Sequence, residues 1–289
     1  MNKTSLDVNG MKRIAFQGEP GAYSEEGAFK YFGNSIQTIG YKTLSDVFQN
    51  LKEDKVDFAI VPVENSIEGS IGQAYDLLLT YNLKACGEVF HRIKHCLISF
   101  PNTDLKSIKT VYSHPQALGQ CRKFLEELEC EIIPFYDTAG SVNMIKEKNL
   151  RNAAGIASAR AARIYGMKVI VEGIETNHNN YTRFLILSKK DSEPTGNDKT
   201  SIIFSTKHVP GALYDALAIF SVSDINLTKI ESRPIVGRPW EYNFYLDFEG
   251  HHKEKLVDVA LEILKRNSLF MKMIGSYPMA KETFSKDRL

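Results

Sequence analysis

Short apolar runs alternate with amphipathic runs along the first two thirds of the chain. The strand-like runs include residues 12–18 (KRIAFQG), 56–65 (VDFAIVPVEN) and 182–189 (TRFLILSK). Runs with helical spacing, such as residues 43–55 (TLSDVFQNLKEDK), lie between them. Strands separated by helices are typical of parallel α/β sheets, in which ligands gather at the carboxyl ends of the strands. The first part of the chain is therefore predicted to be an α/β fold with a ligand site at that edge.

A polar segment at residues 188–201 (SKKDSEPTGNDKTS) divides the chain. It contains Pro194 and Gly196 and separates two apolar strand-like runs, which is typical of a linker. The part that follows reads strand, helix, strand, strand, helix, strand, which is the order of a ferredoxin-like βαββαβ domain. We place the linker at residues 190–199 and this second domain at residues 200–280.

Composition excludes several classes of protein. The formal net charge of +1 indicates no general attraction to nucleic acid or to an anionic membrane, and no apolar run has the length of a membrane span. Four cysteines in 289 residues, without a C-x-x-C pair, favour reduced thiols in a cytoplasmic protein. His91 and His95 between Cys86 and Cys96 match no common zinc spacing, so a metal site there is the less favoured interpretation.

Four polar tips follow predicted strands and precede predicted helices. They are residues 17–24 (QGEPGAYS), 61–66 (VPVENS), 112–118 (YSHPQAL) and 135–141 (FYDTAGS). The N-terminus of a helix offers backbone N–H groups to an anion. Four such tips indicate an anionic small molecule bound in a cleft, although this pattern by itself names no reaction.

One predicted strand carries an arginine near its start. In NYTRFLILS, Arg183 stands where a strand buried on both faces is expected, and arginine is rarely fully buried without a partner. Two kinds of partner remain open: a bound carboxylate, or a protein carboxylate in a structural salt bridge. Thr182 beside it is either a packed strand residue or a hydrogen-bond donor to a ligand.

Taken together, the motifs resemble those of prephenate dehydratase followed by an ACT regulatory domain. They stand here as FQGEPGAYSEEGA, VPVENSIEGSI, VYSHPQALGQC, DTAGSV, GIASARAARIYG and NYTRF, then PGALYDALAIF and INLTKIESRP. The resemblance covers residues 12 to about 280. One departure is Gly140-Ser141-Val142 after the D-T-A triplet, where the family has more alanines. This difference bears on helix packing, on the pocket wall and on fine specificity.

The resemblance implies a two-lobed, periplasmic-binding-protein-like catalytic domain at residues 12–189, with parallel-rich sheets. One lobe is expected at residues 12–90 plus 168–189, and the other at residues 91–167. A homodimer or homotetramer that pairs through its ACT domains is implied as well. Some relatives carry a chorismate mutase domain upstream, but this chain has only a short polar lead there, so we expect the monofunctional form.

The activity implied by the resemblance is the conversion of prephenate to phenylpyruvate in L-phenylalanine biosynthesis, with L-phenylalanine as a feedback effector. The substrate is a cyclohexadienol dianion that loses hydroxide and carbon dioxide together as its ring becomes aromatic. This reaction needs a donor at the departing hydroxyl, an anchor for the pyruvyl carboxylate and a dry cavity. No metal and no organic cofactor is expected.

Five residues are implied to carry the reaction. Thr182 would donate to the leaving hydroxyl, Arg183 would hold a carboxylate through its planar fork, and Phe184 would orient the pair. The proton would come from Glu64, provided that burial raises its pKa, or from His114. Ordinary roles compete with these. Thr182 would be a packed strand residue, Arg183 would form a structural salt bridge, and Phe184 would be a core residue. Glu64 would cap a helix or pair with an arginine, and His114 would be a hydrogen-bonded structural histidine.

Several polar residues are expected to bind the substrate. Their amides and hydroxyls can donate to an anion. They are Tyr23, Ser24, Asn65, Ser66, Ser113, Gln116 and Thr138. A tight turn is the alternative for the first tip and a helix cap is the alternative for Thr138, while Asp137 is interpreted as a capping or orienting carboxylate.

In the second domain, PGAL and ESRP resemble the phenylalanine-binding motifs of this family. The implied effector residues are Gly211, Ala212, Leu213, Glu231, Ser232, Arg233 and Pro234. Gly211 would let the backbone approach the ligand, while Glu231 and Arg233 would meet its ammonium and carboxylate groups. Ion pairs between subunits are the alternative for these two charged residues.

Two other functions fit the sequence. Arogenate carries an ammonium where prephenate carries a ketone, so an acidic group near that position would favour an arogenate dehydratase. A non-catalytic amino-acid sensor would also have two α/β lobes and an ACT domain. The intact Thr182-Arg183-Phe184 weighs against this sensor, and turnover of prephenate distinguishes it from the enzyme.

Overall fold

The computed structural model describes residues 10–235 and 237–281, so most of the polar lead lies outside the described residues. The chain divides into two units. The first unit comprises the residues up to Ala74 together with Val89–Phe184. The second comprises Tyr75–Glu88 and the residues from Leu185 on. None of the helices in the described part of the chain is both long and apolar enough to cross a membrane.

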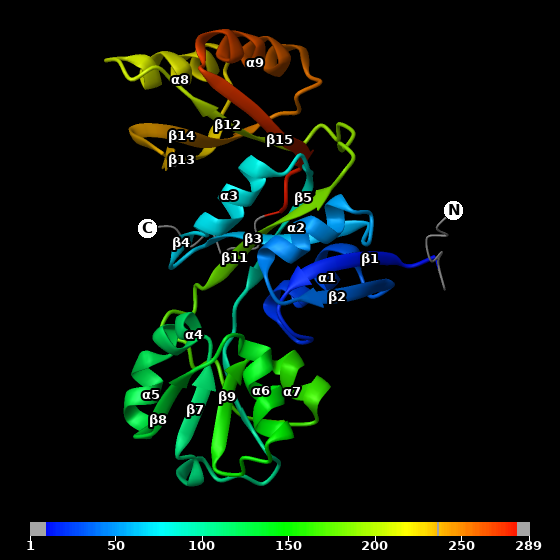
Figure 1. Ribbon diagram of the computed structural model, residues 1–289, viewed down its shortest axis with the longest axis vertical. Coiled ribbons are helices and arrows are strands. Elements are labelled where there is room, and N and C mark those ends of the chain that lie inside the picture. The colour runs from blue at the N-terminus through cyan, green and yellow to red at the C-terminus, as the bar shows by residue number, and fades with distance from the viewer. Residues whose placement is uncertain (1–9, 236, 282–289) are drawn as a thin grey trace. The chain divides into compact units, whose positions relative to one another are not determined.

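The first unit contains a sheet with the strand order β2-β1-β3-β11-β5, with β4 paired to β3 (Figure 1). Its strands are β1 (Lys12–Gln17), β2 (Ile36–Tyr41), β3 (Phe58–Asn65), β4 (Gly69–Ser70), β5 (Lys84–Arg92) and β11 (Tyr181–Ser188). Its helices are α1 (Tyr23–Phe32), α2 (Leu44–Lys52) and α3 (Gly72–Thr80). β1 pairs in parallel with both β2 and β3. The elements α3, β5 and β11 continue from the first unit into the second.

A second sheet of the first unit has the strand order β10-β6-β9-β7-β8. Its strands are β6 (Cys96–Ser99), β7 (Thr110–Ser113), β8 (Glu131–Pro134), β9 (Ala153–Ala157) and β10 (Lys168–Glu172). Its helices are η1 (Leu105–Ser107), α4 (Pro115–Gln120), α5 (Arg122–Leu128), α6 (Thr138–Glu147) and α7 (Ala159–Tyr165). Small residues let α6 lie close to β9, since a Cβ on Gly155 would come within 2.9 Å of Val142. The predicted two-lobed α/β fold with parallel-rich sheets is confirmed.

One predicted lobe boundary is wrong. The prediction assigns residues 168–172 to the first lobe, but β10 pairs antiparallel with β6 in the second sheet. The second lobe therefore extends to Glu172, and the chain crosses between the sheets at residues 93–95 and 173–180. These two crossovers are bonded to each other, because the Ile93 amide donates to the Asn180 carbonyl over 2.8 Å.

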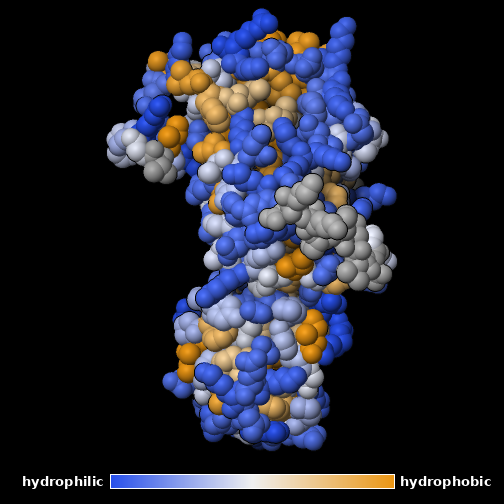
Figure 2. Space-filling model, turned by 45° about the vertical axis from the view of Figure 1, so that its right-hand side comes forward, coloured by the Kyte–Doolittle hydropathy of each residue, from blue (hydrophilic) through white to orange (hydrophobic). Residues whose placement is uncertain are grey.

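The second unit contains the predicted ferredoxin-like domain, with the antiparallel strand order β13-β14-β12-β15. The strands are β12 (Asp198–Ser205), β13 (Leu227–Ile235), β14 (Arg238–Glu249) and β15 (Phe270–Pro278), and the helices are α8 (Ala212–Val222) and α9 (Lys255–Asn267). Ile202, Phe220 and Leu264 lie in the core between sheet and helices. In Figure 2, apolar side chains are visible among hydrophilic ones on this domain, at the top of the view.

The second unit also includes the end of α3 and the start of β5. Glu88 of β5 and Lys199 of β12 form an ion pair of 2.8 Å, and both side chains are buried. Gly275 of β15 packs directly on β5, since a Cβ at this position would collide with the Ala85 carbonyl oxygen. The predicted boundary at residue 189 therefore separates segments that pack together.

Candidate active site

Three of the four predicted polar tips line one cavity of about 190 Å³ in the first unit. The first tip contributes Gln17, which ends β1, and then Gly18, Glu19, Ala22, Tyr23 and Ser24. The other lining residues are Lys42 after β2, His114 after β7, and Tyr136, Asp137 and Thr138 after β8. Both α1 and α6 begin at this cavity, so their first N–H groups add to its polar lining. The combination of helix N-termini with Lys42 suits an anionic ligand.

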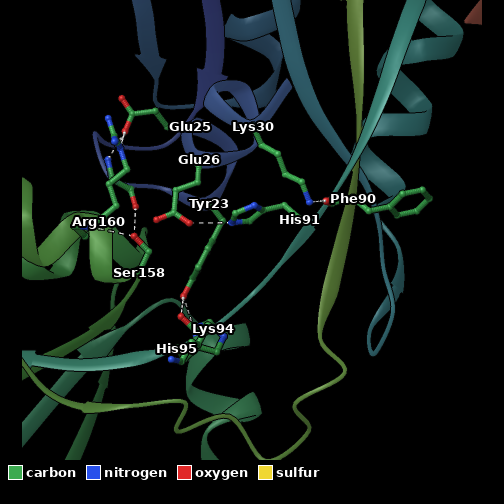
Figure 3. Close-up of polar contacts among 12 residues, drawn as sticks. Tyr23, Glu25, Glu26, Lys30, Phe90, His91, Lys94, His95, Ser158 and Arg160 are labelled. Carbon is green, nitrogen blue, oxygen red and sulfur yellow. Dashed lines mark hydrogen bonds and ion pairs between the residues drawn. The ribbon is translucent and has the colours of Figure 1, made fainter. Parts of the chain in front are cut away.

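The first tip is joined to the second lobe by several contacts (Figure 3). Ser158 Oγ donates to the Gly21 carbonyl over 2.7 Å, and Arg160 Nε lies 3.1 Å from Glu25 Oε2. The same Glu25 oxygen accepts the Gly21 amide over 2.7 Å. Gly21 has a φ of +93°, and a Cβ there would lie 2.7 Å from Ala161 Cα. Only glycine therefore lets the loop come this close to α7.

Asp137 contributes an acid to the cavity wall. Its Oδ1 accepts the Gly140 amide over 2.6 Å and so caps α6, as the sequence suggested for a capping carboxylate. Burial raises the pKa of Asp137 to about 6, and nearby Glu19 adds to that rise. Glu19 itself accepts a hydrogen bond of 2.9 Å from the Tyr136 hydroxyl. The cavity therefore holds two carboxyl groups beside its cationic and N–H groups.

We expect Asp137→Asn to stabilise the protein increasingly as pH rises from 4 to 7. The pKa of about 6 in the folded chain lies above the unfolded value of about 3.9, so the folded state binds more protons between these values. The free energy of unfolding that Asp137 contributes therefore falls as pH rises through this window. Asparagine can keep the cap without a charge.

Thermal unfolding of Asp137→Asn and of the original protein at pH 4.5 and 7.5 measures this effect. The difference in Tm between the two proteins should grow at the higher pH. A difference that stays constant across this range would contradict a raised pKa at Asp137.

His114 caps the next helix. Its Nδ1 accepts the Gln116 amide over 3.3 Å at the start of α4, and burial lowers the pKa of its imidazole. The imidazole is therefore mainly neutral at pH 7, which weakens His114 as a general acid. Ser113 is buried and donates to the Ile156 carbonyl over 2.6 Å, while Gln116 is exposed. Neither Ser113 nor Gln116 lines the cavity.

Asn65, at the end of β3, holds Thr182 of β11. Its Oδ1 accepts the amides of Ile67 and Glu68 over 3.0 Å each, which fixes the orientation of the side-chain amide. Its Nδ2 must then donate, and it reaches Thr182 Oγ1 over 3.1 Å. The Thr182 oxygen accepts this bond and keeps its own proton available for donation. Both side chains are buried.

A partly buried hydrogen-bond chain continues from Asn65 to Tyr23 in the cavity wall. Asn65 Nδ2 donates to Asn180 Oδ1 over 2.8 Å, and Asn180 Nδ2 donates to Gln120 Oε1 over 2.7 Å. His95 Nε2 lies 2.9 Å from the same Gln120 oxygen. Figure 3 shows the other side of the ring, where Nδ1 lies 2.9 Å from the Tyr23 hydroxyl. Burial lowers the pKa of His95. We assign the neutral form with the proton on Nε2, because Gln120 Oε1 can only accept. The single Tyr23 hydroxyl proton is then shared between His95 Nδ1 and the Lys94 carbonyl, which lies 3.0 Å away.

Sequence reasoning missed His95, Gln120 and Asn180 in this chain. His95 and Asn180 lie on the two crossovers between the sheets, and Gln120 ends α4. Gln120 and Asn180 belong to motifs that the sequence analysis quoted, VYSHPQALGQC and NYTRF, and this was the only signal for them. His95 was considered only as a possible metal ligand. Tyr23, expected to bind substrate, lines the cavity but turns its hydroxyl toward His95.

Arg183 and Glu64 lie together, away from Thr182. Arg183 is buried, and its Nη1 lies 3.9 Å from Glu64 Oε2. Side chains alternate along a strand, so Arg183 points to the opposite face of β11 from Thr182 and Phe184. Phe184 packs toward α1, since a Cβ on Gly27 would lie 3.5 Å from its ring. This geometry matches the salt-bridge interpretation of Arg183, and its contact with substrate remains a prediction.

Ser66 fastens the loop before β11. Its Oγ donates to the Asn179 carbonyl over 2.8 Å and accepts the Tyr181 amide over 2.9 Å.

Thr138 is the first residue of α6, and Ser24 lies in the first turn of α1. No group of three or more metal-binding side chains was found among the described residues.

The predicted effector residues lie on two elements of the second unit. Gly211, with a φ of +83°, precedes Ala212 and Leu213 at the start of α8. Glu231, Ser232, Arg233 and Pro234 lie on β13. Glu231 pairs with Lys229 over 3.2 Å, and Arg233 pairs with Asp76 over 3.2 Å. A cavity of about 600 Å³ beside α8 is lined by Tyr214, Leu217, Val222 and neighbouring residues, but not by these seven.

The family model and several relatives that match this chain are named for prephenate or arogenate dehydratase. The family model "Prephenate dehydratase" matches residues 14–192. The bifunctional chorismate mutase/prephenate dehydratase of Aquifex aeolicus is 38% identical over 270 residues, 93% of this chain and 74% of that protein. Arogenate dehydratase/prephenate dehydratase 2 of Arabidopsis thaliana is 40% identical over 278 residues, 92% of this chain and 73% of that protein. The structure of prephenate dehydratase from Arthrobacter aurescens in complex with L-Phe has a TM-score of 0.84 and 30% identity, and the match covers 92% of this chain and 90% of that one.

Proposed function

The chain belongs to the prephenate dehydratase family and is a prephenate dehydratase, a hydro-lyase, and from this premise we propose how its residues carry the reaction. The ring carboxylate leaves as carbon dioxide, and the electron pair of its C–C bond enters the ring. The C–O bond across the ring breaks, and the departing hydroxide takes up a proton to become water. The protein must therefore donate to one oxygen while it holds a dianion.

Thr182 is the donor to the departing hydroxyl. The observation that carries this role is the hydrogen bond from Asn65 Nδ2 to Thr182 Oγ1, because it directs the threonine proton away from Asn65. A donor held in place before the reaction stabilises the leaving oxygen without reorganisation. Phe184, packed against α1, fixes β11 at this position.

The cavity residues bind the substrate carboxylates. Lys42 and the N-termini of α1 and α6 provide positive potential, and Ser24 and Thr138 add hydroxyl donors. For the proton, Asp137 joins Glu64 and His114 as a candidate, because its pKa of about 6 makes it an acid near neutral pH. Glu64 is less favoured as the source, since it pairs with Arg183.

Arogenate is a second candidate substrate, and the acids of the cavity favour it. Glu19 and Asp137 can accept an ammonium group, which arogenate has and prephenate lacks. The Arabidopsis relative is named for both substrates. Arogenate would give phenylalanine directly, with the same loss of water and carbon dioxide.

Turnover of prephenate and arogenate side by side tests both proposals. We expect conversion of prephenate, and a loss of about tenfold or more in kcat/KM for arogenate alone in Glu19→Gln, because a charged partner of the ammonium is removed. Glu53→Gln, an exposed acid on α2's C-terminal side, is the matched control. Prephenate that binds without conversion would instead support the amino-acid sensor. Equal losses for both substrates in Glu19→Gln would exclude Glu19 as a specificity residue.

Regulation by L-phenylalanine follows from the second domain. The Arthrobacter enzyme was solved with L-Phe, and the PGAL and ESRP motifs stand here on α8 and β13. Pairing through this domain as a homodimer or homotetramer is supported by apolar side chains on α8, where Tyr214 and Val222 are 75% and 86% exposed. The four free cysteines fit the cytoplasm, where thiols stay reduced.

A further inference from the structure

The second half of α3 is held by three strands of the ACT domain within the second unit. Lys272 of β15 donates to the carbonyls of Leu78, Leu79 and Tyr81 over 2.9, 2.8 and 2.7 Å. The last turn of α3 has no basic residue of its own. Lys272 therefore supplies the charge and the donors that the C-terminal carbonyls of a helix need.

A second contact between α3 and the ACT domain lies one turn earlier, at Tyr75. The Tyr245 hydroxyl donates to the Tyr75 carbonyl over 3.3 Å, and the two rings meet edge to face at 4.7 Å. The ammonium of Lys229 lies 5.7 Å from the centre of the Tyr75 ring. Tyr245 and Lys229 come from β14 and β13, and Lys229 lies two residues before the ESRP motif.

The third contact is the ion pair between Arg233 and Asp76, and it does not use all the donors of the guanidinium. A single guanidinium nitrogen, Nη2, reaches both oxygens of Asp76, at 3.2 and 3.3 Å. Arg233 Nε is buried and has no hydrogen-bond partner among the described residues. A carboxylate bonded to Nε and one terminal nitrogen would give the parallel two-bond fork that guanidinium favours. The present pair therefore leaves donor capacity unused at a buried atom, which is unfavourable.

Asp76 is the partner that Arg233 can release at low cost. Its side chain is 62% exposed, so its carboxylate is readily hydrated once it leaves the guanidinium. Exposed ion pairs of this kind contribute about 0.2–1 kcal/mol. A ligand carboxylate that accepts from Arg233 Nε makes a hydrogen bond that Asp76 does not make. The ligand therefore favours the state in which Asp76 is released from Arg233 over the state in which they are paired.

We propose that Arg233 is shared between Asp76 and the carboxylate of the effector. Effector binding then breaks the Arg233–Asp76 ion pair, one of the three contacts that hold α3. This inference rests on the proposed role of L-phenylalanine as effector. α3 begins at Gly72, directly after β4, whose Gly69 pairs with Asn65. Asn65 in turn orients Thr182. Through β4, α3 is therefore connected along the chain to Asn65, and Asn65 positions the proposed donor Thr182.

The test is a double-mutant cycle on L-phenylalanine binding, measured by calorimetry on the full chain. In Asp76→Asn, no carboxylate competes for Arg233, so the Kd for L-phenylalanine should fall by about 1.4- to 5-fold, the equivalent of an exposed ion pair. The concentration of L-phenylalanine that halves prephenate turnover should fall by the same factor. Asp258→Asn removes an exposed acid from α9 of the same unit and should change neither value.

The second arm of the cycle uses Arg233→Gln, which removes the charge for which Asp76 and the effector carboxylate compete. In this background, Asp76→Asn should no longer change the Kd. An unchanged Kd in Asp76→Asn alone, or the same shift in both backgrounds, would overturn the shared-arginine proposal. Absence of L-phenylalanine binding to the original protein would overturn the effector proposal and this inference with it, while prephenate turnover tests the enzymatic function separately.

Discussion

Thr182→Val is expected to lower kcat for prephenate by about 10²–10³-fold, the usual loss for one preorganised donor to a developing oxyanion. Valine has nearly the shape of threonine but cannot donate to the departing hydroxyl. Asn65 loses one acceptor in this variant and keeps another in Asn180, so thermal unfolding should change little. Steady-state kinetics with a matched unfolding curve measures both quantities.

Two further variants distinguish the donor role from packing. Thr182→Ser keeps the hydroxyl and should retain most of the turnover. Asn65→Asp removes the amide donor, so the Thr182 hydroxyl would donate to the new carboxylate instead of to the substrate. Turnover should then fall strongly even though the threonine is present. Near-normal kcat in Thr182→Val would remove Thr182 from the mechanism.

The polar residues that line the cavity could be predicted from sequence because each tip is a local pattern. The runs that form β1, β7, β8 and the helices after them are visible in the sequence, and parallel strands of one sheet bring their carboxyl ends to one edge. The segments that form β2, α3, β5 and β6 were not predicted. The tips at His114 and Asp137 lie at one edge of the second sheet for that reason, because β7 and β8 pair in parallel. Gly18 follows β1 of the first sheet, so its place in the same cavity depends on contact between the two lobes, which local patterns do not predict. The fourth tip, at Asn65, meets Thr182 instead.

Other features depend on contacts between distant residues, which leave no periodic signal. The antiparallel pairing of β10 with β6 joins residues about 70 positions apart. It places residues 168–172 in the second lobe, whereas the sequence analysis placed them in the first. His95, Gln120 and Asn180 act together only because two crossovers and the end of α4 meet. The opposite directions of Thr182 and Arg183 follow from strand alternation, but which face carries the cavity is a tertiary property.

Gly21→Ala is expected to lower kcat/KM for prephenate by about 10²-fold, the scale of loss when catalytic groups are displaced by about 1 Å. An alanine Cβ would lie 2.7 Å from Ala161 Cα and 3.1 Å from its amide nitrogen, and backbone atoms cannot turn aside as a flexible side chain can. The loop from Gly18 to Ser24 must then move away from α7. That movement weakens the bonds that Ser158 and Tyr165 make to this loop and shifts the cavity wall.

Gly33→Ala separates this collision from the cost of the backbone angle. Gly33 also has a positive φ, +79°, but a Cβ there meets nothing within 4 Å. Both variants should lose about 1–3 kcal/mol of stability from the strained backbone, and Gly21→Ala should lose more because of the collision. Only Gly21→Ala should also lose kcat/KM, because Gly33 follows α1 at the end remote from Tyr23. If the two variants lost equal stability and both kept turnover, the close approach of the first tip to α7 would have no part in shaping the site.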